Sequence, residues 1–391
     1  MDKVVTMRIT QLFLYKFRNY DELSLDLNQG LNVILGHNGQ GKTNLIEAIY
    51  LLSQGRMFRP GQLNTIINKN NNPLFHTQVS AKFLKDGAEN KIKFNIQNNK
   101  KKYLLNEKVL SSKMNQQKFQ TVLFSPESLS AIKSGPEQRR GLIDEILVLD
   151  NPENQKILNE YTKTLRTKNR ILKDYRAEKI SKVEFLSLID SLNEIFLQQS
   201  LNLTQLRLHA IEAIIESVQS IYSHIQHKNV DISVEYQVSG QNILGWQPEE
   251  IQSLLEKRQS ELFSAEMHSG SSLTGAHRHD IAILCDGEDS RYYCSQGQQR
   301  AIILSFKIAQ ILNYIKKFKE APILLLDDVL SELDKEKRTY LVDFINAVEA
   351  QIFITSTELA LDKKQEFKED VSIFVVNNGT IKKEFKGELR V

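Results

Sequence analysis

The sequence predicts an α/β fold with a mixed sheet, interrupted by an inserted and mainly helical lobe. Near both ends of the chain, short apolar runs typical of buried strands alternate with stretches of helical spacing. Between Pro152 and Gly240 the chain contains neither glycine nor proline, the residues that most often interrupt a helix. We therefore divide the chain into an α/β half at 1–135, the helical lobe at 136–292 and a second α/β half at 293–391.

The composition of the 391 residues is that of a globular protein, with 41% hydrophobic and 25% charged residues. A mostly disordered chain, a collagen-like repeat and a small disulfide scaffold are thereby excluded. The net charge is only +3, so local clusters of basic residues decide whether nucleic acid is a partner. Two cysteines (Cys285 and Cys294), no secretion signal and no apolar run of membrane-spanning length lead us to expect a cytoplasmic protein without membrane association.

Apolar periodicity places the elements of the two α/β halves. In the first half, residues 31–35 form a buried strand, and a glycine-rich loop leads from it into a helix over 43–52. Three later β-type runs, at 78–83, 91–97 and 102–105, predict an antiparallel patch on the core sheet. The second half is predicted as helix, strand, helix, strand and a hairpin turning at Asn378-Gly379, with the ranges 298–317, 323–326, 335–350, 352–355, 371–377 and 380–385.

The helical lobe carries a repeated apolar face. Its apolar residues fall three, four or seven positions apart, as they do on one side of a helix. They include Leu158, Tyr161, Leu165, Leu172 and Tyr175 and continue from Leu188 to Ile225. A polar break at 179–182 separates two antiparallel helices, and the heptads are too few for an extended coiled-coil rod.

A P-loop connects strand 31–35 to the helix that follows. Its sequence, Gly36-His-Asn-Gly-Gln-Gly-Lys42-Thr43, has the glycines and the Lys-Thr pair at the required spacing. The glycines let backbone N–H groups converge on phosphate oxygens, and the helix N-terminus adds partial positive charge. We expect Lys42 to reach the β- and γ-phosphates and Thr43 to offer its hydroxyl to Mg²⁺.

Two further motifs follow the helical lobe. Strand 323–326 ends in Asp327, which suits a Mg²⁺ site, and Asp328, which projects the other way and suits polarising the attacking water. Before it, Ser295-Gln-Gly-Gln-Gln-Arg300 opens a helix, so its hydroxyl, N–H groups and helix dipole make a second phosphate cradle. Serine N-caps are common, so this hexamer alone is weak evidence for a phosphate-binding site. Its position in the sequence, between the P-loop and the Asp-Asp pair, makes the evidence stronger.

In this order of motifs the chain resembles the bacterial RecF family of recombination and repair ATPases. The family belongs to the ABC/SMC-type ATPases, whose heads dimerise head-to-tail around two nucleotides. The resemblance implies a P-loop ABC-type head as the fold, ATP and Mg²⁺ as cofactors, and a weak DNA-dependent ATPase activity. The motifs that carry it cover essentially the whole chain: 17–20, 36–43, 55–59, 122–126, 139–140 with Asp144, 275–278, 295–300 and 324–334.

The resemblance also implies roles for individual residues. Lys42, Asp328 and Ser295 would be the catalytic residues, and Thr43 and Asp327 would hold Mg²⁺. A loop containing Ser331 and Asp334 would cross the dimer interface. Arg18 is placed near the nucleotide phosphates, with a plain surface role as the alternative. The implied nucleotide-binding residues are Arg18, Asn38, Gly39, Gln40, Gly41, Lys42, Thr43, Asn44, Ser295, Gly297 and Gln298.

The chain departs from the family pattern at several positions. Ala276 and His279 replace a proline and an acid, and Gly141 replaces a bulkier residue. Residues 124–129 contain no glutamine where many members place one near the metal, so the residue of that loop is left unassigned. His277, His279 and Asp280 admit a metal site, but a hydrogen-bonding cluster is favoured because metal ligands need a converging fourth group and a fixed second shell.

A basic run lies near the start of the helical lobe. Four of its members recur at helical spacing beside the apolar face, where they would neutralise DNA phosphates and give salt-sensitive, sequence-independent affinity. An ordinary solvated helix face and a protein-binding surface are the alternatives. The four are Lys163, Arg166, Arg170 and Lys173, and the run also contains Lys168, Arg176, Lys179 and Lys182.

These observations lead to the hypothesis of an ATP-operated DNA clamp or switch. ATP would join Lys42 of one subunit to Ser295 of the other in a homodimer, and hydrolysis would release it. The resemblance adds double-stranded and gapped or junction DNA, RecR- and RecO-type partners, and help in loading recombinase on single-stranded gaps. The alternatives are a transporter's nucleotide-binding subunit, a rod-bearing chromosome or break-repair ATPase, and a DNA scaffold that binds ATP without turnover.

Overall fold

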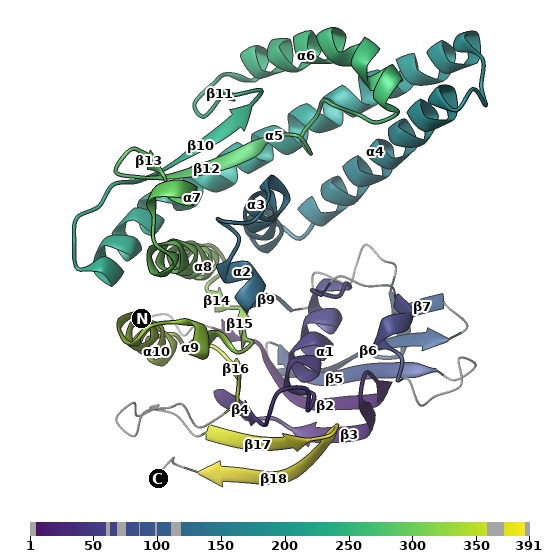
Figure 1. The fold of residues 1–391 in the computed structure, drawn as a ribbon. Helices are drawn as coiled ribbons and strands as arrows, with labels where there is room; N and C mark the ends of the chain where they lie inside the picture. Colours follow the sequence, from purple (N-terminus) through teal and green to yellow (C-terminus); the bar gives the residue numbers. More distant parts are fainter. Residues whose placement is uncertain are drawn as a thin grey trace. The chain divides into compact units, whose positions relative to one another are not determined.

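The computed structural model describes residues 5–59, 63–68, 76–85, 87–97, 100–110, 119–357 and 371–387 (Figure 1). The chain forms two compact units. Unit 1 comprises Met1–Leu129 and Lys307–Val391, and unit 2 comprises Ser130–Phe306. The second border falls inside helix α8 (Gln296–Phe318), so this helix belongs to both units. The three-part division at 135/136 and 292/293 stays a prediction of domain extent.

Unit 1 contains a mixed, six-stranded core sheet. Its central strands are parallel and buried along nearly their whole length, as expected for a sheet that is covered on both faces. Only the last strand runs antiparallel to its neighbour, through the hairpin that the sequence predicts at Asn378-Gly379. The order is β18 (Thr380–Gly387), β17 (Val371–Asn377), β4 (Leu31–Leu35), β16 (Ile352–Ser356), β15 (Ile323–Leu326) and β9 (Thr121–Phe124).

A second sheet of unit 1 is antiparallel throughout, and it corrects one expectation. The strands predicted at 78–83, 91–97 and 102–105 do not join the core sheet, because β5 pairs with β2. In β2 and β3 buried residues are separated by exposed or half-buried ones, so each strand has one apolar face. The order is β3 (Tyr20–Asp26), β2 (Arg8–Phe17), β5 (Thr77–Lys85), β6 (Ala88–Gln97), β7 (Lys100–Leu105) and β8 (Lys108–Leu110).

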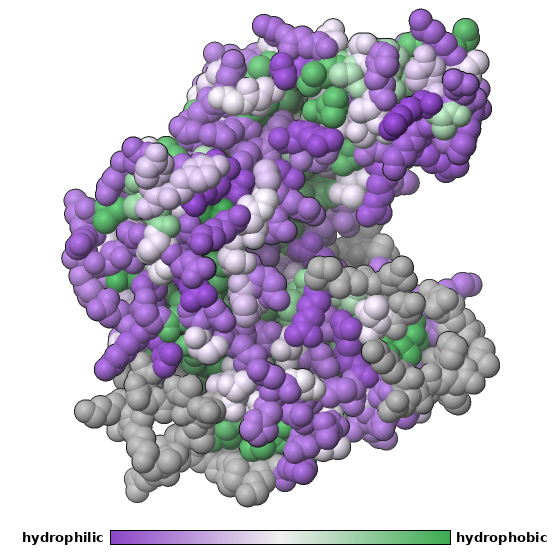
Figure 2. Space-filling view, viewed as in Figure 1, coloured by the Kyte–Doolittle hydropathy of each residue, from purple (hydrophilic) through white to green (hydrophobic). Residues whose placement is uncertain are grey.

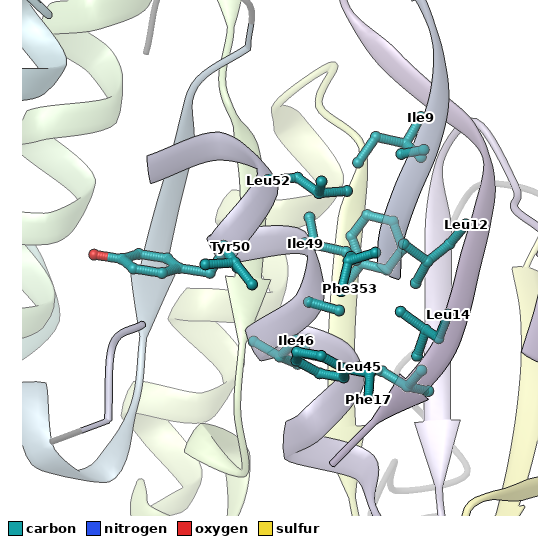
Figure 3. Packing of buried hydrophobic residues seen from close by; sticks show 14 of the residues in the cluster. Ile9, Leu12, Leu14, Phe17, Leu45, Ile46, Ile49, Tyr50, Leu52 and Phe353 are labelled. Atoms are coloured by element: carbon teal, nitrogen blue, oxygen red, sulfur yellow. The ribbon is translucent and has the colours of Figure 1, made fainter. Parts of the chain in front are cut away.

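Helix α1 (Lys42–Gln54) packs against strands of both sheets and links their cores. In Figure 3, side chains of β2 point toward the helix, and Phe353 of β16 lies in the same apolar cluster. This apolar contact fixes the N-terminus of α1, which follows the P-loop directly. The buried side chains in this contact include Ile9, Leu12, Leu14, Phe17, Leu45, Ile46, Ile49 and Leu52.

The remaining elements of unit 1 are short, apart from one helix. The predicted helix at 335–350 is observed as α10, which ends earlier, at Ala347. The elements are β1 (Val5–Thr6) paired in parallel with β14 (Glu320–Ala321), the 3₁₀ helix η1 (Leu63–Ile66), α2 (Pro126–Leu129), α9 (Val329–Glu332) and α10 (Lys335–Ala347).

Unit 2 contains long helices, as the absence of glycine and proline predicts. The break expected at 179–182 is the turn between α4 and α5, where the Ser181 hydroxyl accepts a hydrogen bond from Glu184 N–H and caps α5. Leu172, Phe185 and Ile189 form a small buried cluster between the two helices. The helices are α3 (Pro136–Asp150), α4 (Asn154–Arg176), α5 (Lys182–Gln226), α6 (Pro248–Ser269) and α7 (Ser290–Tyr293).

Unit 2 also contains a four-stranded antiparallel sheet that the sequence analysis treats as part of a helical lobe. The overlooked signal is the alternation in Ile232, Val234, Tyr236 and Val238, all buried, with half-buried residues between them. The order is β11 (Gln241–Asn242), β10 (Ile232–Val238), β12 (Asp280–Cys285) and β13 (Glu288–Asp289).

Hydrophilic side chains cover most of the surface in view, with hydrophobic residues in small separate areas (Figure 2). Among the helices of the described residues, we find none with the length and hydropathy needed to span a bilayer. Cys285 and Cys294 are both free thiols and both partly buried.

Candidate functional site

The P-loop has the sharp backbone path that its glycines permit. Gly36 lies so close to β17 that an added Cβ would stand 2.6 Å from the backbone oxygen of Val376. Gly41 has a φ of 117°, and a Cβ there would meet the side chains of Asn19 and Tyr20 at 2.7–2.9 Å. Both positions therefore require glycine, and the loop follows β4 and leads into α1 as the sequence predicts.

The turn between β2 and β3 supports the P-loop from one side. Asn19 Nδ2 donates to the backbone oxygen of Gln40 at 2.7 Å, and Tyr20 Oη donates to that of Gly41 at 2.9 Å. Asn44 Nδ2 donates to Asn19 Oδ1 at 2.8 Å, which connects this turn to the first turn of α1. Asn19 and Tyr20 are supporting residues that the motif analysis did not assign, although they belong to the segment 17–20.

The hairpin between β17 and β18 supports the same loop from another direction. Asn378 N–H donates to Gln40 Oε1 at 2.7 Å, and Gly379 N–H donates to the Gln40 backbone oxygen at 3.0 Å. Gln40 therefore has a clear role in holding the loop, and its direct contact with nucleotide stays a prediction. Asn38 and Gly39 are exposed at the tip of the loop.

Lys42 is buried but loosely held. Its Nζ lies 3.4 Å from the His37 backbone oxygen and 3.9 Å from Asp328 Oδ2, and only 4% of its side chain is exposed. At 3.9 Å the ammonium and the carboxylate attract each other without the geometry of a strong hydrogen bond. The cation is therefore already desolvated, and an approaching phosphate does not have to displace a tight partner.

Asp327 lies in a buried position beside two hydroxyl groups. Thr355 Oγ1 donates to Asp327 Oδ1 at 2.8 Å, and the Thr43 hydroxyl is a second donor to the same carboxylate. Burial raises the pKa of Asp327, while these two hydrogen bonds act against the rise. A carboxylate next to the Thr43 hydroxyl supplies the hard oxygen ligands that Mg²⁺ prefers, so these residues fit the expected metal.

Asp328 is positioned by the same threonine. Its backbone N–H donates to Thr355 Oγ1 at 2.8 Å, and its φ of 50° turns the chain after the strand. Thr355 thus connects the two acidic residues, although no local sequence motif marks it. The role of Thr355 follows only from strand pairing, because the parallel register pairs Leu326 with Ile354 and places Thr355 beside Asp327.

The loop after β9 also lies next to this site. Asp327 N–H donates to the Phe124 backbone oxygen at 2.9 Å, so the end of β9 adjoins the acidic pair. Ser125 and Ser128 then bond each other, with Ser125 N–H donating to Ser128 Oγ at 2.9 Å. The residue of this turn that would face a metal stays unassigned.

Arg18 is already bound within the protein. Its Nε and Nη2 donate to the two carboxylate oxygens of Glu47, each at 2.8 Å, and its Nη1 donates to the Thr65 backbone oxygen at 2.8 Å. Glu47 is fully buried on α1, so this bidentate pair fixes the turn after β2 against the helix. A contact between Arg18 and nucleotide stays a prediction.

Residues 295–300 in unit 2, called the signature segment below, contain a complete capping box. Ser295 Oγ accepts from Gln298 N–H at 3.2 Å, and Gln298 Oε1 accepts from Ser295 N–H at 2.8 Å. Ser295 is exposed, and its hydroxyl hydrogen is not used by this box. Gly297 is half-buried in the first turn of α8. The helix start predicted here is confirmed, and the contact with a partner's nucleotide stays a prediction.

The segment after Asp328 is locally ordered. Ser331 Oγ donates to the Asp328 backbone oxygen at 2.7 Å, and Asp334 Oδ1 accepts from Lys337 N–H at 3.1 Å as the cap of α10. Ser331 and Asp334 are both exposed. Their proposed place in a dimer interface stays a prediction.

The four basic residues at helical spacing on α4 are exposed, whereas a fifth member of the run is not. Lys168 is fully buried, and its Nζ lies 2.9 Å from Glu266 Oε2 and 4.7 Å from the Phe196 ring centroid. Glu266 in turn accepts from the Ser272 hydroxyl at 2.9 Å. Lys168 therefore anchors the interior of unit 2 and is unavailable to DNA. The exposed four are Lys163, Arg166, Arg170 and Lys173.

Around His277 and His279 the expected hydrogen-bonding cluster is present. His277 Nδ1 bonds the Tyr161 hydroxyl at 2.8 Å, and His279 Nδ1 bonds the Tyr236 hydroxyl at 3.1 Å. Arg139 binds Asp280 through two hydrogen bonds of 2.8 and 2.9 Å. Within the described residues, no group of three or more His, Cys, Asp or Glu side chains is arranged to hold a metal ion.

Residues 8–382 match the family model described as the RecF/RecN/SMC N-terminal domain. The chain is 33% identical over 356 residues to the DNA replication and repair protein RecF of Syntrophotalea carbinolica, covering 90% of this chain and 93% of the relative. It is 32% identical to the protein of the same description from Alkaliphilus oremlandii, covering 96% of this chain and the whole relative.

Solved structures give the same picture. A structure of the recombination mediator protein RecF-ATP in the RecFOR pathway superposes with a TM-score of 0.85 and 29% identity, over 98% of this chain and 99% of that one. The Smc head domain of Pyrococcus furiosus, with a coiled coil and bound to the C-terminal domain of ScpA, is similar in fold, with a TM-score of 0.54 and 17% identity.

Proposed function

This chain belongs to the RecF family of P-loop ATPases, and on that premise we propose that it acts in DNA repair as an ATP-operated, DNA-binding homodimer. The observation that carries the proposal is the meeting of the P-loop with the acidic pair. Lys42 faces Asp328, and the Thr43 hydroxyl bonds Asp327. The relatives' place in the RecFOR pathway supports RecR- and RecO-type partners and a role in loading recombinase at single-stranded gaps.

In the proposed reaction, the backbone of the P-loop holds the phosphates of ATP and Lys42 neutralises the β/γ charge. Thr43 and Asp327 hold Mg²⁺, which supplies charge stabilisation to the transferring phosphoryl group. Asp328 orients and polarises the attacking water. Thr355 keeps both carboxylates in place, because one hydroxyl bonds Asp327 and the Asp328 backbone at once.

The homodimer is proposed because Ser295 is exposed at the start of a long helix. Its box with Gln298 satisfies the helix end and leaves the hydroxyl hydrogen available to a phosphate oxygen. ATP held by the P-loop of one subunit would therefore complete its contacts on Ser295, Gly297 and Gln298 of the other. Ser331 and Asp334 would border the same interface. Hydrolysis removes the γ-phosphate bridge and releases the dimer.

A matched pair of variants tests the dimer. Ser295→Arg places a bulky cation at the proposed interface, and Ser181→Arg makes the same change at the exposed cap of α5. By sedimentation velocity with ATP, we expect Ser295→Arg to remain monomeric while it binds nucleotide normally, and Ser181→Arg to dimerise like the unsubstituted chain. An equal dimer fraction in the two variants would contradict the scheme.

The role of Asp328 is tested by Asp328→Asn. This change keeps the size of the side chain but removes the negative charge that polarises water. We expect hydrolysis to become too slow to release the dimer, so ATP-bound dimers accumulate on DNA. Rapid phosphate release by the variant would assign water activation to another group.

DNA binding is proposed for the exposed strip of Lys163, Arg166, Arg170 and Lys173 on α4. Removing one side chain that neutralises a phosphate should lower the slope of log affinity against log salt concentration by about 0.9. Fluorescence anisotropy with a duplex and with a gapped duplex measures this slope for Lys163→Gln. Lys257→Gln, an exposed lysine on α6, is the control and should leave the slope unchanged. Equal slopes in both variants would exclude the strip.

A further inference from the structure

Two adjacent aromatic side chains directly before the signature segment are exposed. Tyr292 has 76% of its surface exposed and Tyr293 has 69%, the highest values for aromatic residues among the described residues. Exposed large apolar side chains are ordinarily scattered singly over a surface. The exposure of a neighbouring pair, whose second member is two positions before Ser295, is therefore best explained by contact with a binding partner.

The pair sits on a short helix that is held firmly by polar contacts. The guanidinium of Arg291 bonds Asp289 at 2.9 and 3.0 Å and Asp280 at 3.0 Å, and lies 5.4 Å from the centre of the Tyr292 ring. Gln299 Nε2 donates to the backbone oxygens of Ser290 at 2.7 Å and Cys294 at 3.2 Å, which ties both ends of α7 to α8.

The contacts of Arg291 and Gln299 hold α7, and with it the two exposed tyrosines, in place in the unbound chain. Arg291 is attached to its carboxylates and supports one ring by a cation–π contact. Because the backbone of α7 is already fixed, little conformational entropy remains to be lost when the rings are covered. Rigid, exposed tyrosines beside a polar binding element are typical of the residues that dominate the affinity of protein interfaces.

We propose that Tyr292 and Tyr293 are the aromatic anchor by which one copy of this chain recognises the nucleotide-binding face of a second copy. The inference rests on the proposed function, because it places the rings at the rim of the interface that Ser295 enters. Only Cys294 separates Tyr293 from Ser295, so a partner that reaches the serine also meets the rings. The serine supplies the polar contact with ATP, and the rings supply apolar contact with the protein around it.

Three variants of the full chain test the anchor. Tyr292→Ala/Tyr293→Ala removes the rings, Tyr292→Phe/Tyr293→Phe keeps them, and Val183→Ala changes an 80% exposed apolar residue at the start of α5. Sedimentation velocity with a slowly hydrolysed ATP analogue gives the dimer dissociation constant. Titration of the monomer with a fluorescent ATP analogue shows that each variant folds and binds nucleotide.

We expect the alanine pair to raise the dimer dissociation constant about thirtyfold, the scale of an interface hot spot, with nucleotide binding unchanged. The phenylalanine pair and Val183→Ala should dimerise like the unsubstituted chain. Equal dimerisation of the alanine pair overturns the anchor and leaves the proposed dimer intact. If the alanine pair dimerises normally but loses duplex DNA, the rings contact DNA and the anchor is likewise overturned. Failure of the unsubstituted chain to dimerise overturns the proposed function and the anchor together.

Discussion

The two units each contain a nearly inaccessible cation, but they hold it in opposite ways. Lys42 of unit 1 and Arg207 of unit 2 both have 4% of their side chain exposed. Arg207 bonds Asp144 at 2.7 and 2.9 Å and the Ala276 backbone oxygen at 2.8 Å. Lys42 has, among the residues that the structure describes, a carbonyl at 3.4 Å and a carboxylate at 3.9 Å as its polar neighbours.

Burial alone therefore does not identify a functional charge. A buried cation with full hydrogen bonding holds the fold together, and removing it leaves its partners unpaired. A buried cation without close partners has lost its water and keeps its charge for a ligand. Unit 2 repeats the first arrangement in the pair Arg139–Asp280, and the P-loop of unit 1 shows the second.

The largest effect is expected for Arg207→Met. The change leaves Asp144 without its partner and should lower the free energy of unfolding of unit 2 by about 3–5 kcal/mol. Urea denaturation monitored by circular dichroism measures the loss. Arg258→Met breaks an exposed pair with Glu261 and should cost less than about 1 kcal/mol. A similar, small loss in both variants would mean that the bonding of Arg207 does not matter for stability.

The next effect concerns Lys42→Met. Because Lys42 is proposed to neutralise phosphate charge, we expect its loss to lower the affinity for ATP about a hundredfold, or roughly 2.7 kcal/mol. The free energy of unfolding should change by less than about 1 kcal/mol. Titration with a fluorescent ATP analogue measures the affinity, with Lys82→Met, an exposed lysine of the same unit, as the control. If Lys42→Met lowered the free energy of unfolding as much as Arg207→Met, both cations would be structural and the proposed difference between them would be wrong.

A smaller effect on the free energy of unfolding is expected when the pH is lowered, because His279 and His277 are buried. Burial, with Arg207 next, lowers the pKa of His279 well below 6.5, and burial lowers the pKa of His277 to about 4. The unfolded chain therefore takes up these protons first. Stability is fully present above pH 6.5 and falls as the pH drops, by about 1.4 kcal/mol per pH unit for each histidine.

Urea denaturation between pH 7.5 and 5.5 tests this dependence. His279→Gln should remove about half of the slope that the two histidines produce in that interval. His209→Gln, at an exposed position on α5, is the control for replacing a histidine in unit 2. An unchanged slope in His279→Gln would show that the histidine accepts a proton in the folded protein.

The smallest effect on stability is expected for Arg170→Gln. This side chain is 85% exposed and lies 3.7 Å from Asp174, an exposed pair whose loss should cost less than about 0.5 kcal/mol. The same denaturation experiment measures it. A loss as large as that of Arg207→Met would give Arg170 a structural role and weaken its proposed part in DNA binding.

Much of the candidate site follows from contiguous sequence. The P-loop, the acidic pair and the signature serine lie where a strand meets a helix or a helix begins, so local pattern places them. Thr355 is different, because only the parallel pairing of β16 with β15 brings it beside Asp327. The support of Gln40 by Asn19 and Asn378 likewise depends on segments far apart in the chain.

The sequence by itself determined the main strands and helices around the P-loop and the acidic pair, the P-loop itself and the cap of α8, because glycine, serine and apolar spacing act through the local backbone. It did not determine which strands share a sheet, and β5–β7 were assigned to the wrong one. Strand pairing, the burial of Lys168 against Glu266 and the bridge of Thr355 were decided only in the tertiary structure. Each joins residues distant in the chain, and burying apolar faces brings them together.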